Sequence, residues 1–345
     1  MGIKPKSLPV PLLLAVVTLL ALPAAAQATL AYTRGLFKPV VYSAQDNGQG
    51  QKKIGPGRSP KVSPDGQLIA FDREAKPGHD ELKLAAANGS SVKTILTNLR
   101  GGFYLAFSPD STTIAALQGP EIGKEALVLI NLASGSVRTV ARGFFSGLSF
   151  SPDSGEIVYS RATSERYPLR SDVFRAPVAG GTPVAITHDH KSLDPLWGPQ
   201  NRIVLAKQSV IKGRMGVPRN DLYLIDPDGS GVKRLTHTQV TPLTQGLFPT
   251  QWSDSGNQLL TEYEGQDTSY AVTVNPRTGA ERAIDKRNQG EQGFVGTAIS
   301  GDGRTVLGWT GGFEPGPNHN VATAPYGGGK IKVLVKNASE ADWSK

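Results

Sequence analysis

The sequence predicts an all-β protein built from repeated four-stranded sheets, and three features lead to this prediction. A turn of the type Ser-Pro-Asp recurs along the chain. Each copy precedes a short run of consecutive apolar residues, as expected for a strand that is buried on both faces. No segment shows convincing helical periodicity. Repeats of about 40–50 residues with several short strands each are typical of the blades of a β-propeller.

The turn marks the register of the repeat. Its copies are VSPDGQLIAF (62–71), FSPDSTTIAAL (107–117), FSPDSGEIVYS (150–160), WGPQNRIVLA (197–206), WSDSGNQLLTE (252–262) and ISGDGRTVLGW (299–309). Their third turn residues are Asp65, Asp110, Asp153, Gln200, Ser255 and Asp302. Proline holds φ at about −65°, and Ser or Asp can hydrogen-bond the turn backbone, so each copy should join two strands. The recurring Asp residues are therefore interpreted as turn residues and not as catalytic groups.

A second hairpin follows the first in most copies. Examples are ALVLINLASGSVRTV (126–140), DVFRAPVAGGTPVAIT (172–187), DLYLIDPDGSGVKRLT (221–236) and YAVTVNPRTGAERAI (270–284). Glycine-containing turns between alternating runs indicate antiparallel pairing. Each period thus supplies four antiparallel strands, A to D from the centre outwards.

The two ends of the chain complement each other. Residues 30–54 resemble strands B, C and D of a blade without its innermost strand, and the tail ASEADWSK (338–345) resembles an isolated strand A. Pairing of this tail with the N-terminal blade would close the propeller and remove an open sheet edge. The sequence therefore predicts seven blades, with six as the alternative if the N-terminal segment forms no true blade.

The repeat resembles a known family. The pattern FSPDG…IAF…LYLID-DGSG-KRLT is similar to the TolB-like, WD-repeat-related β-propeller repeats of exported bacterial proteins, and the similarity covers nearly all of residues 30–345. The resemblance implies a β-propeller fold, and it is specific for the fold rather than for a function, since similar propellers also accompany prolyl-oligopeptidase-type hydrolases. Residues 29–345 leave no room for the additional α/β or hydrolase domain that accompanies such propellers, so we expect a single domain.

The first residues predict an export signal over 1–28. Lys4 and Lys6 precede the uncharged apolar stretch 10–22, and small residues follow it. This order is typical of a secretory signal peptide, with cleavage expected before Thr29. An uncleaved anchor is the alternative, but the stretch is shorter than the roughly 18 residues of a membrane span. We expect a secreted or periplasmic protein with no integral membrane span after cleavage.

Composition excludes several kinds of chemistry. The 345 residues include no cysteine, so disulfides, thiolate metal sites and cysteine nucleophiles are excluded. The net charge of +8 favours acidic partners, but the basic residues are not interleaved with aromatic ones as in a nucleic-acid interface. No nucleophile elbow, phosphate-binding Gly-rich loop or zinc-binding helix motif occurs. We expect no nucleic-acid partner, no cofactor, no metal and no catalytic residue.

The histidines allow two interpretations. His188 and His190 are two residues apart with Asp194 nearby, so a His-x-His-Asp metal site is conceivable. The alternative is a polar surface loop, because Thr187-His188 and Thr236-His237 occupy the same repeat position.

Long basic loops predict a binding face. In a propeller the B–C and D–A connections lie on one face, and loops of variable length commonly carry function. The candidate residues are Arg161, Arg166, Tyr167, Arg170, His188, His190, Lys191, Arg214, Arg219 and His237. Arginine and histidine gathered there would suit an acidic peptide or glycan, and a solvated rim is the alternative interpretation.

The sequence therefore predicts a monomeric, non-catalytic propeller that binds an envelope or extracellular protein or ligand. The alternative is a propeller enzyme, or a carbohydrate- or peptide-binding protein, with its site at the mouth of the channel. An enzyme would require acids and bases from different blades to converge.

Overall fold

The computed structural model describes residues 2, 28–100, 104–120, 123–163, 170–210, 218–266, 268–285, 293–311 and 318–344. Within these ranges the regular structure consists of β-strands alone, so the all-β prediction is confirmed. The strands are β1 (Thr29–Arg34), β2 (Val40–Gln45), β3 (Lys52–Pro56), β4 (Arg58–Val62), β5 (Leu68–Lys76), β6 (His79–Ala86), β7 (Lys93–Leu99), β8 (Ala106–Phe107), β9 (Thr113–Gln118), β10 (Glu125–Asn131), β11 (Val137–Phe150), β12 (Glu156–Ala162), β13 (Ser171–Pro177), β14 (Val184–Ala185), β15 (Ser192–Trp197), β16 (Ile203–Val210), β17 (Pro218–Ile225), β18 (Lys233–Arg234), β19 (Thr244–Trp252), β20 (Leu259–Gly265), β21 (Ser269–Val274), β22 (Glu281–Ala283), β23 (Val295–Ile299), β24 (Thr305–Thr310), β25 (Asn320–Pro325), β26 (Lys332–Lys336) and β27 (Ser339–Trp343).

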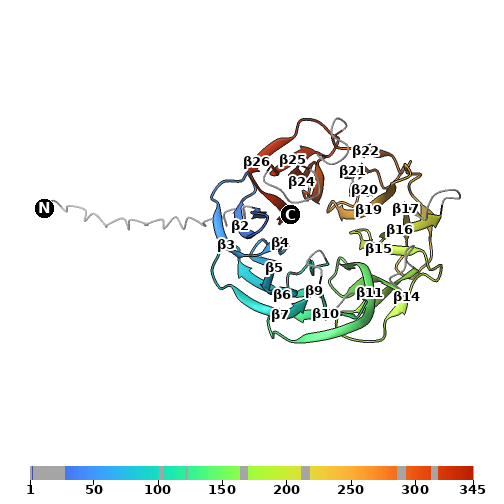
Figure 1. Cartoon of the computed structure of the whole chain (residues 1–345), viewed down its shortest axis with the longest axis horizontal. Coiled ribbons are helices and arrows are strands. Elements are labelled where there is room, and N and C mark those ends of the chain that lie inside the picture. The colour runs from blue at the N-terminus through green and yellow to red at the C-terminus, as the bar shows by residue number, and fades with distance from the viewer. Residues whose placement is uncertain are drawn as a thin grey trace.

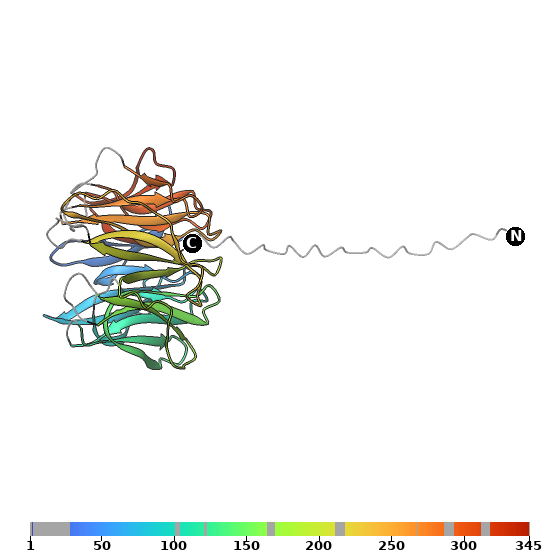
Figure 2. The same cartoon turned by 90° about the vertical axis from the view of Figure 1, so that its right-hand side faces the viewer.

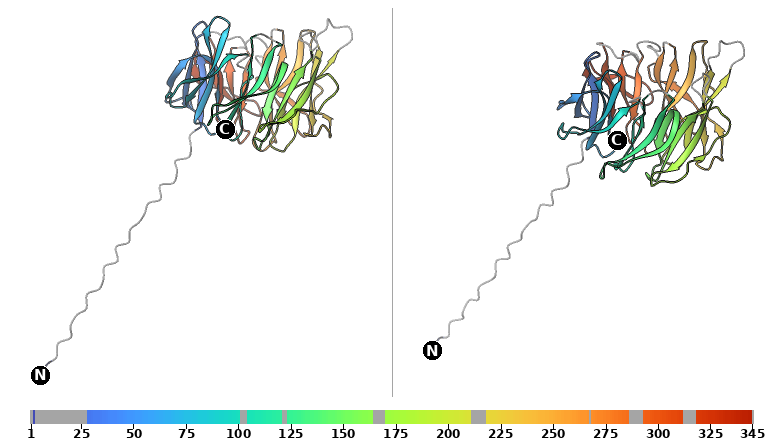
Figure 3. Two further views of the ribbon diagram at one scale, coloured as in Figure 1. Left: turned by 90° about the horizontal axis from the view of Figure 1, so that it is seen from below. Right: turned by 60° about the horizontal axis from the view of Figure 1, so that its bottom comes forward.

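The strands follow one another in antiparallel groups of four, and single-residue pairings of β7 with β9 and of β17 with β19 join some of these groups into larger sheets. The groups are β27-β1-β2-β3, β4 to β7, β8-β9-β10 with the first part of β11, the second part of β11 with β12-β13-β14, β15 to β18, β19 to β22, and β23 to β26. The long strand β11 serves two groups, because residues 137–143 pair with β10 and residues 144–150 pair with β12. Figure 1 shows these groups arranged around a common centre, with the first strand of each group innermost. In the side views of Figure 2 and Figure 3 the strands run roughly parallel to the central axis.

The hydrophobic core lies between neighbouring groups. Ala70 and Leu82 of the β4–β7 group pack with Ile114 and Val128 of the next group. Equivalent clusters lie between all the remaining pairs of consecutive groups. Because each sheet packs against a neighbour on both faces, its strands need consecutive apolar residues, as the sequence pattern predicts.

The Ser-Pro-Asp segments form the expected turns between the first and second strands. Ser63 Oγ donates to Asp65 Oδ1 at 2.5 Å, and the same carboxylate oxygen accepts the Gln67 N–H at 3.0 Å. Asp110, Asp153 and Asp302 make the same serine contact. These Asp side chains hold turns, which agrees with their interpretation as structural residues.

The C-terminal strand β27 pairs antiparallel with β1 and is the innermost strand of that group. Trp343 is 9% exposed and packs with Leu30, Tyr32 and Leu307. Two carboxylates of β27 also bind the backbone of β4: Glu340 accepts the Ser59 N–H at 2.9 Å, and Asp342 accepts the Val62 N–H at 2.8 Å. The strand thus joins the first group to its neighbours on both sides.

The predicted export signal lies almost entirely outside the described residues, which resume at Ala28. It therefore stays a prediction. Among the described residues, no helix has the length and apolar character needed to cross a bilayer.

Candidate functional site

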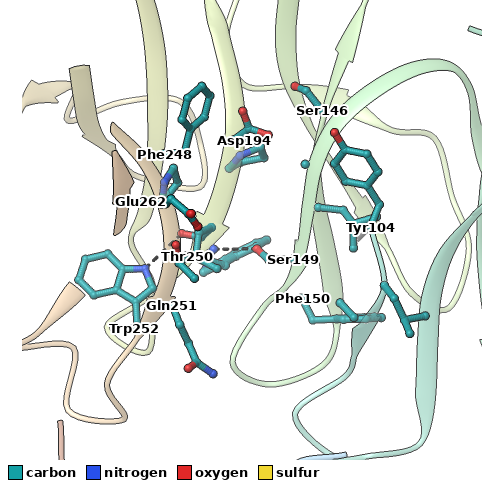
Figure 4. Close-up of a pocket in the computed structure, with 18 of the residues that line it drawn as sticks. Tyr104, Ser146, Ser149, Phe150, Asp194, Phe248, Thr250, Gln251, Trp252 and Glu262 are labelled. Atoms are coloured by element: carbon teal, nitrogen blue, oxygen red, sulfur yellow. Dashed lines mark hydrogen bonds between the residues drawn. The ribbon is translucent and has the colours of Figure 1, made fainter. Parts of the chain in front are cut away.

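A cavity of about 1140 Å³ occupies the centre around which the sheets are arranged. Residues of the innermost strands β4, β8, β11, β15, β19 and β23 line it, together with the second strands β16 and β20. Figure 4 shows Tyr104, Ser146, Asp194 and Phe248 at one end and Phe150, Gln251 and Trp252 at the other. We call the first the entry end, because the chain enters the innermost strands there, as at Tyr104 just before β8. We call the second the turn end, because the turns to the second strands begin there, as after Trp252 at the end of β19. The volume suits a peptide segment or a short oligosaccharide.

A β-bulge interrupts the innermost strand at a similar point in several groups. The register shifts lie between Arg58 and Lys61, Phe145 and Gly147, Leu193 and Leu196, Pro249 and Gln251, and Gly296 and Ala298. Residues at this point in three groups have positive φ, namely +50° at Ser59, +48° at Asp194 and +50° at Glu340. A bulge changes the direction of a side chain. In β15 it leaves Asp194 lining the cavity.

Asp194 is fixed by its neighbours in the preceding group. Its backbone N–H donates to Ser160 Oγ at 3.3 Å. Gly147 leaves the space in which Asp194 lies, since a Cβ at Gly147 would stand 2.7 Å from Asp194 Cα and 2.9 Å from Asp194 Oδ1. The position of the carboxyl group is therefore set by the contact between two blades.

Two further carboxyl groups reach the cavity from β20. Glu262 and Glu264 are two residues apart, so their side chains share one side of the strand. Burial raises the pKa of Glu264 to about 7. Burial also raises the pKa of Glu262 to about 8, although the hydroxyl of Ser269, which donates to the Glu262 carboxylate, opposes this change.

Asp194 and Tyr104 are electrostatically coupled to Glu264. Burial and then the charge of Glu264 raise the pKa of Asp194 well above its usual value. Burial, followed by the charges of Asp194 and Glu264, raises the pKa of Tyr104. The entry end thus gathers acidic groups from three sheets, and the charge of Glu264 disfavours the ionisation of Glu262, Asp194 and Tyr104.

Gln208 lines the same cavity from β16. It occupies the position in β16 that Glu264 has in β20, because Ile203 and Leu259, five residues earlier, pair with Trp197 and Trp252 respectively. Its side chain is only 6% exposed, and its Oε1 has no hydrogen-bond donor among the described residues. A buried amide oxygen without a donor is energetically unfavourable unless a water or ligand supplies one.

The tryptophans at the turn end belong to the core as well as to the cavity. Trp197 and Trp252 are 7% and 6% exposed, as expected for blade core. The indole N–H of Trp197 donates to Asn201 Oδ1 at 3.0 Å, and that of Trp252 donates to the Leu196 carbonyl at 3.3 Å. Their indole N–H groups are engaged within the protein, so they supply apolar walls.

The predicted basic face is only partly assembled by the described residues. His190 Nδ1 lies 2.6 Å from Asp172 Oδ2, and Arg161, which pairs with Asp172 across β12 and β13, stacks over the Phe174 ring at 4.6 Å. Arg170, His188 and Lys191 are exposed. Arg166, Tyr167 and Arg214 lie outside the described residues.

The remaining two candidates lie in the next group. Arg219 Nε stands 3.0 Å from Asp221 Oδ2, which also accepts a bond from Arg234 at 2.7 Å. His237 lines a separate cavity of about 370 Å³ with Glu281 and Tyr263. Arg161, Arg219 and His190 thus already have partners within the protein.

The structure favours the repeat interpretation of the histidines. Thr187 Oγ1 accepts the Val173 N–H and Thr236 Oγ1 accepts the Leu222 N–H, each at 2.9 Å, so the two Thr-His pairs are structurally equivalent. His190 binds Asp172, whereas Asp194 lines the cavity. Throughout the described ranges no group of three His, Cys, Asp or Glu is arranged to hold a metal ion.

Sequence reasoning missed the carboxyl groups and Gln208. A signal was present, because the repeat position three residues before Phe107, Phe150, Trp197 and Trp252 carries Tyr104, Gly147, Asp194 and Pro249. The position carries an acid in β15, and it also does in β27, where Glu340 stands three residues before Trp343. That Asp194 and Glu264 line one cavity could not be read from the sequence.

No family model matches the sequence, and no curated protein matches it either. Solved structures do. The β-propeller domain of the trilobed protease from Pyrococcus furiosus is 17% identical with a TM-score of 0.65, and the match covers 90% of this chain and 93% of that one. TolB from Acinetobacter baumannii is 15% identical with a TM-score of 0.55 over 92% of this chain and 83% of that one. An oligogalacturonate lyase solved with manganese is 14% identical with a TM-score of 0.59 over 89% of this chain and 83% of that one.

These neighbours include a protease domain, a TolB protein and a lyase, so they agree in architecture and differ in function. Identities this low carry the fold alone. The chain has the β-propeller fold, and at the level of the fold the predicted TolB-like architecture is confirmed.

Proposed function

We propose that this protein is an exported, non-catalytic β-propeller that binds a partner protein or ligand of the cell envelope or extracellular space in its central cavity. The observation that carries the proposal is the cavity of about 1140 Å³, which is lined by strands of six successive groups and by aromatic side chains. Concave, largely apolar sites with a few polar groups are typical binding sites.

The proposal includes a ring of seven blades closed by β27. Two observations support it: hydrophobic clusters lie between consecutive groups, and one of them combines β1 and β27 with residues of the last group, such as Leu307 and Val321.

Export is supported by the sequence of residues 1–28. Mass spectrometry of the protein recovered outside the cytoplasm should give Thr29 as the first residue.

The absence of catalysis is supported by the positions of the histidines. No described histidine lines the central cavity, and His190 and His237 have carboxylate neighbours in two different groups. The alternative is an enzyme acting on a carbohydrate or peptide. It is favoured by Glu262 and Glu264, whose pKa values of about 8 and 7 suit general acid–base chemistry near neutral pH.

The basic face is proposed as the surface around the mouth of the cavity. Arg170, His188 and Lys191 are exposed and have side chains available to an acidic protein or glycan. The partner would then contact a basic rim and extend a segment into an acidic cavity.

Affinity capture from the native envelope tests this function. The wild-type protein is compared with Thr250→Trp, which narrows the cavity at a lining residue, and with the rim variant Arg166→Glu/Arg170→Glu/Arg214→Glu. Val137→Trp, on an exposed outer position, is the matched control. We expect one partner to be captured by wild type and control, lost with Thr250→Trp and reduced with the rim variant. Equal capture by all four proteins would contradict the proposal.

A further inference from the structure

The entry end of the cavity contains oxygen acceptors that lack basic partners. Asp194, Glu262 and Glu264 supply carboxylates, and none of them forms a salt bridge with a lysine or arginine in the described part of the chain. Lys61 does line the same cavity, but it comes from β4, which lies across the centre from β15 and β19 in Figure 1. When these carboxyl groups ionise, no lysine or arginine beside them in the described part of the chain balances their charge.

A second and independent observation points the same way. Gln208 lines the same cavity and is only 6% exposed. Its Oε1 has no hydrogen-bond donor among the described residues. A carboxylate site could in principle be relieved by protonation, but an amide oxygen cannot be protonated and requires a hydrogen-bond donor. Gln208 Oε1 therefore needs a donor that the described residues do not supply, and Asp194 and Glu264 line the same cavity.

We propose that the entry end binds an ammonium or guanidinium group, with Asp194, Glu264 and Gln208 Oε1 accepting its N–H bonds. This inference rests on the proposed binding function and names the chemical class of the ligand. A guanidinium carries five N–H donors and an ammonium three, and neither has an acceptor, which matches a site made of acceptors. The positive charge of such a group would also stabilise the ionised form of these carboxyl groups.

The aromatic residues at this end complement the same ligand. Tyr104 and Phe248 stand with Asp194 at the entry end in Figure 4. Aromatic faces attract organic cations and pack against the apolar stem of an arginine or lysine side chain. The large remaining volume leaves space for the backbone of a peptide that carries such a side chain.

Binding of short synthetic peptides to the purified protein tests this inference. The probes are acetyl-Gly-Arg-Gly-amide and its neutral isostere acetyl-Gly-citrulline-Gly-amide, measured by isothermal titration calorimetry. The measurement is made at pH 8, because the raised pKa of about 7 at Glu264 leaves this carboxyl ionised there. We expect the arginine peptide to bind at least about tenfold more tightly than the citrulline peptide, as for one charge-assisted hydrogen bond or more.

Two variants locate the preference. Asp194→Asn/Glu264→Gln should bind both peptides equally, and it should fold well because neutral amides of similar size replace carboxyl groups whose ionisation the fold disfavours. Asp254→Asn, which alters a carboxylate that lines the cavity in the turn after β19, is the matched control and should keep the preference. Agmatine, which carries a guanidinium group but no peptide backbone, shows whether the natural ligand is a peptide or a small amine. Weaker binding of agmatine than of the arginine peptide indicates a peptide ligand, and equal binding indicates a small amine.

Equal affinity of wild type for the arginine and citrulline peptides overturns the inference, and so does failure to bind either one. A preference that persists in Asp194→Asn/Glu264→Gln overturns it as well. These outcomes are separate from the proposed function: loss of partner capture with Thr250→Trp would still support a binding cavity whose ligand is not a cation.

Discussion

At the scale of single residues, the central feature is a set of acids kept in an environment that disfavours their charge. Glu264 lines the cavity beside Asp194 and Glu262, and burial raises its pKa from the usual 4.5 to about 7. An acid that binds its proton more tightly in the folded state than in the unfolded state destabilises the fold as pH rises through that range. Such groups commonly mark functional sites, because nothing in the fold itself requires them.

Replacing Glu264 by glutamine should therefore stabilise the protein in a pH-dependent way. At pH 5 the wild-type side chain is protonated in the folded protein, so the two proteins should differ little. At pH 8 the variant should have a free energy of unfolding higher by about 2–3 kcal/mol, because it escapes the loss of stability between about pH 4.5 and 7. Urea unfolding at both pH values measures this, with Glu74→Gln on an exposed position as the control. A difference that is the same at pH 5 and pH 8 would show that Glu264 is not buried as an acid.

At the scale of the strand, the bulge in β15 decides which side chain enters the cavity. In an unbroken strand, successive side chains would alternate between the two faces of a sheet, and both faces are buried against neighbours here. The register shift between Leu193 and Leu196 and the positive φ of Asp194 break this alternation. The bulge is accommodated by Gly147 of the adjacent blade, so the site depends on a contact between blades.

Gly147→Ala should push this contact apart. The added Cβ would stand 2.7 Å from Asp194 Cα, and backbone atoms at that distance cannot rotate away. We expect a loss of about 1–3 kcal/mol in the free energy of unfolding, together with weaker binding of the arginine peptide. Gly327→Ala is the control, since its Cβ would meet only the Arg282 guanidinium end at 3.5 Å. Equal stability of the two variants would mean that Asp194 does not lie against Gly147.

At the scale of the whole molecule, stability depends on contacts between sheets that are distant in sequence. Trp343 near the C-terminus packs with Leu30 and Tyr32 near the start of the described chain. The Pyrococcus furiosus propeller domain is described as having an open velcro topology, whereas β27 of this chain pairs with β1. If the ring is closed as proposed, β27 contributes as much to the stability of the fold as an internal strand does.

Trp343→Ala tests the closure. If the seam between the ends of the chain is equivalent to an internal seam, the substitution should lower the free energy of unfolding by about 3–5 kcal/mol, as for a buried tryptophan. Trp252→Ala, between two internal blades, should give a loss of similar size. Val333→Ala, on a side chain 45% exposed in β26, should change stability little. Denaturant unfolding compares the three variants, and a small effect of Trp343→Ala alone would contradict closure by β27.

The repeat in the sequence determined the propeller fold, the place of each turn and the complementary ends of the chain. It could do so because turn chemistry and burial on both faces of a strand are local requirements that each repeat must satisfy separately. The tertiary structure alone decided the site. Asp194, Glu264 and Gln208 come from two sheets, and their nearness follows from how those sheets pack around the axis. The sequence drew attention instead to the basic loops, since charge is visible in a sequence and shared burial is not.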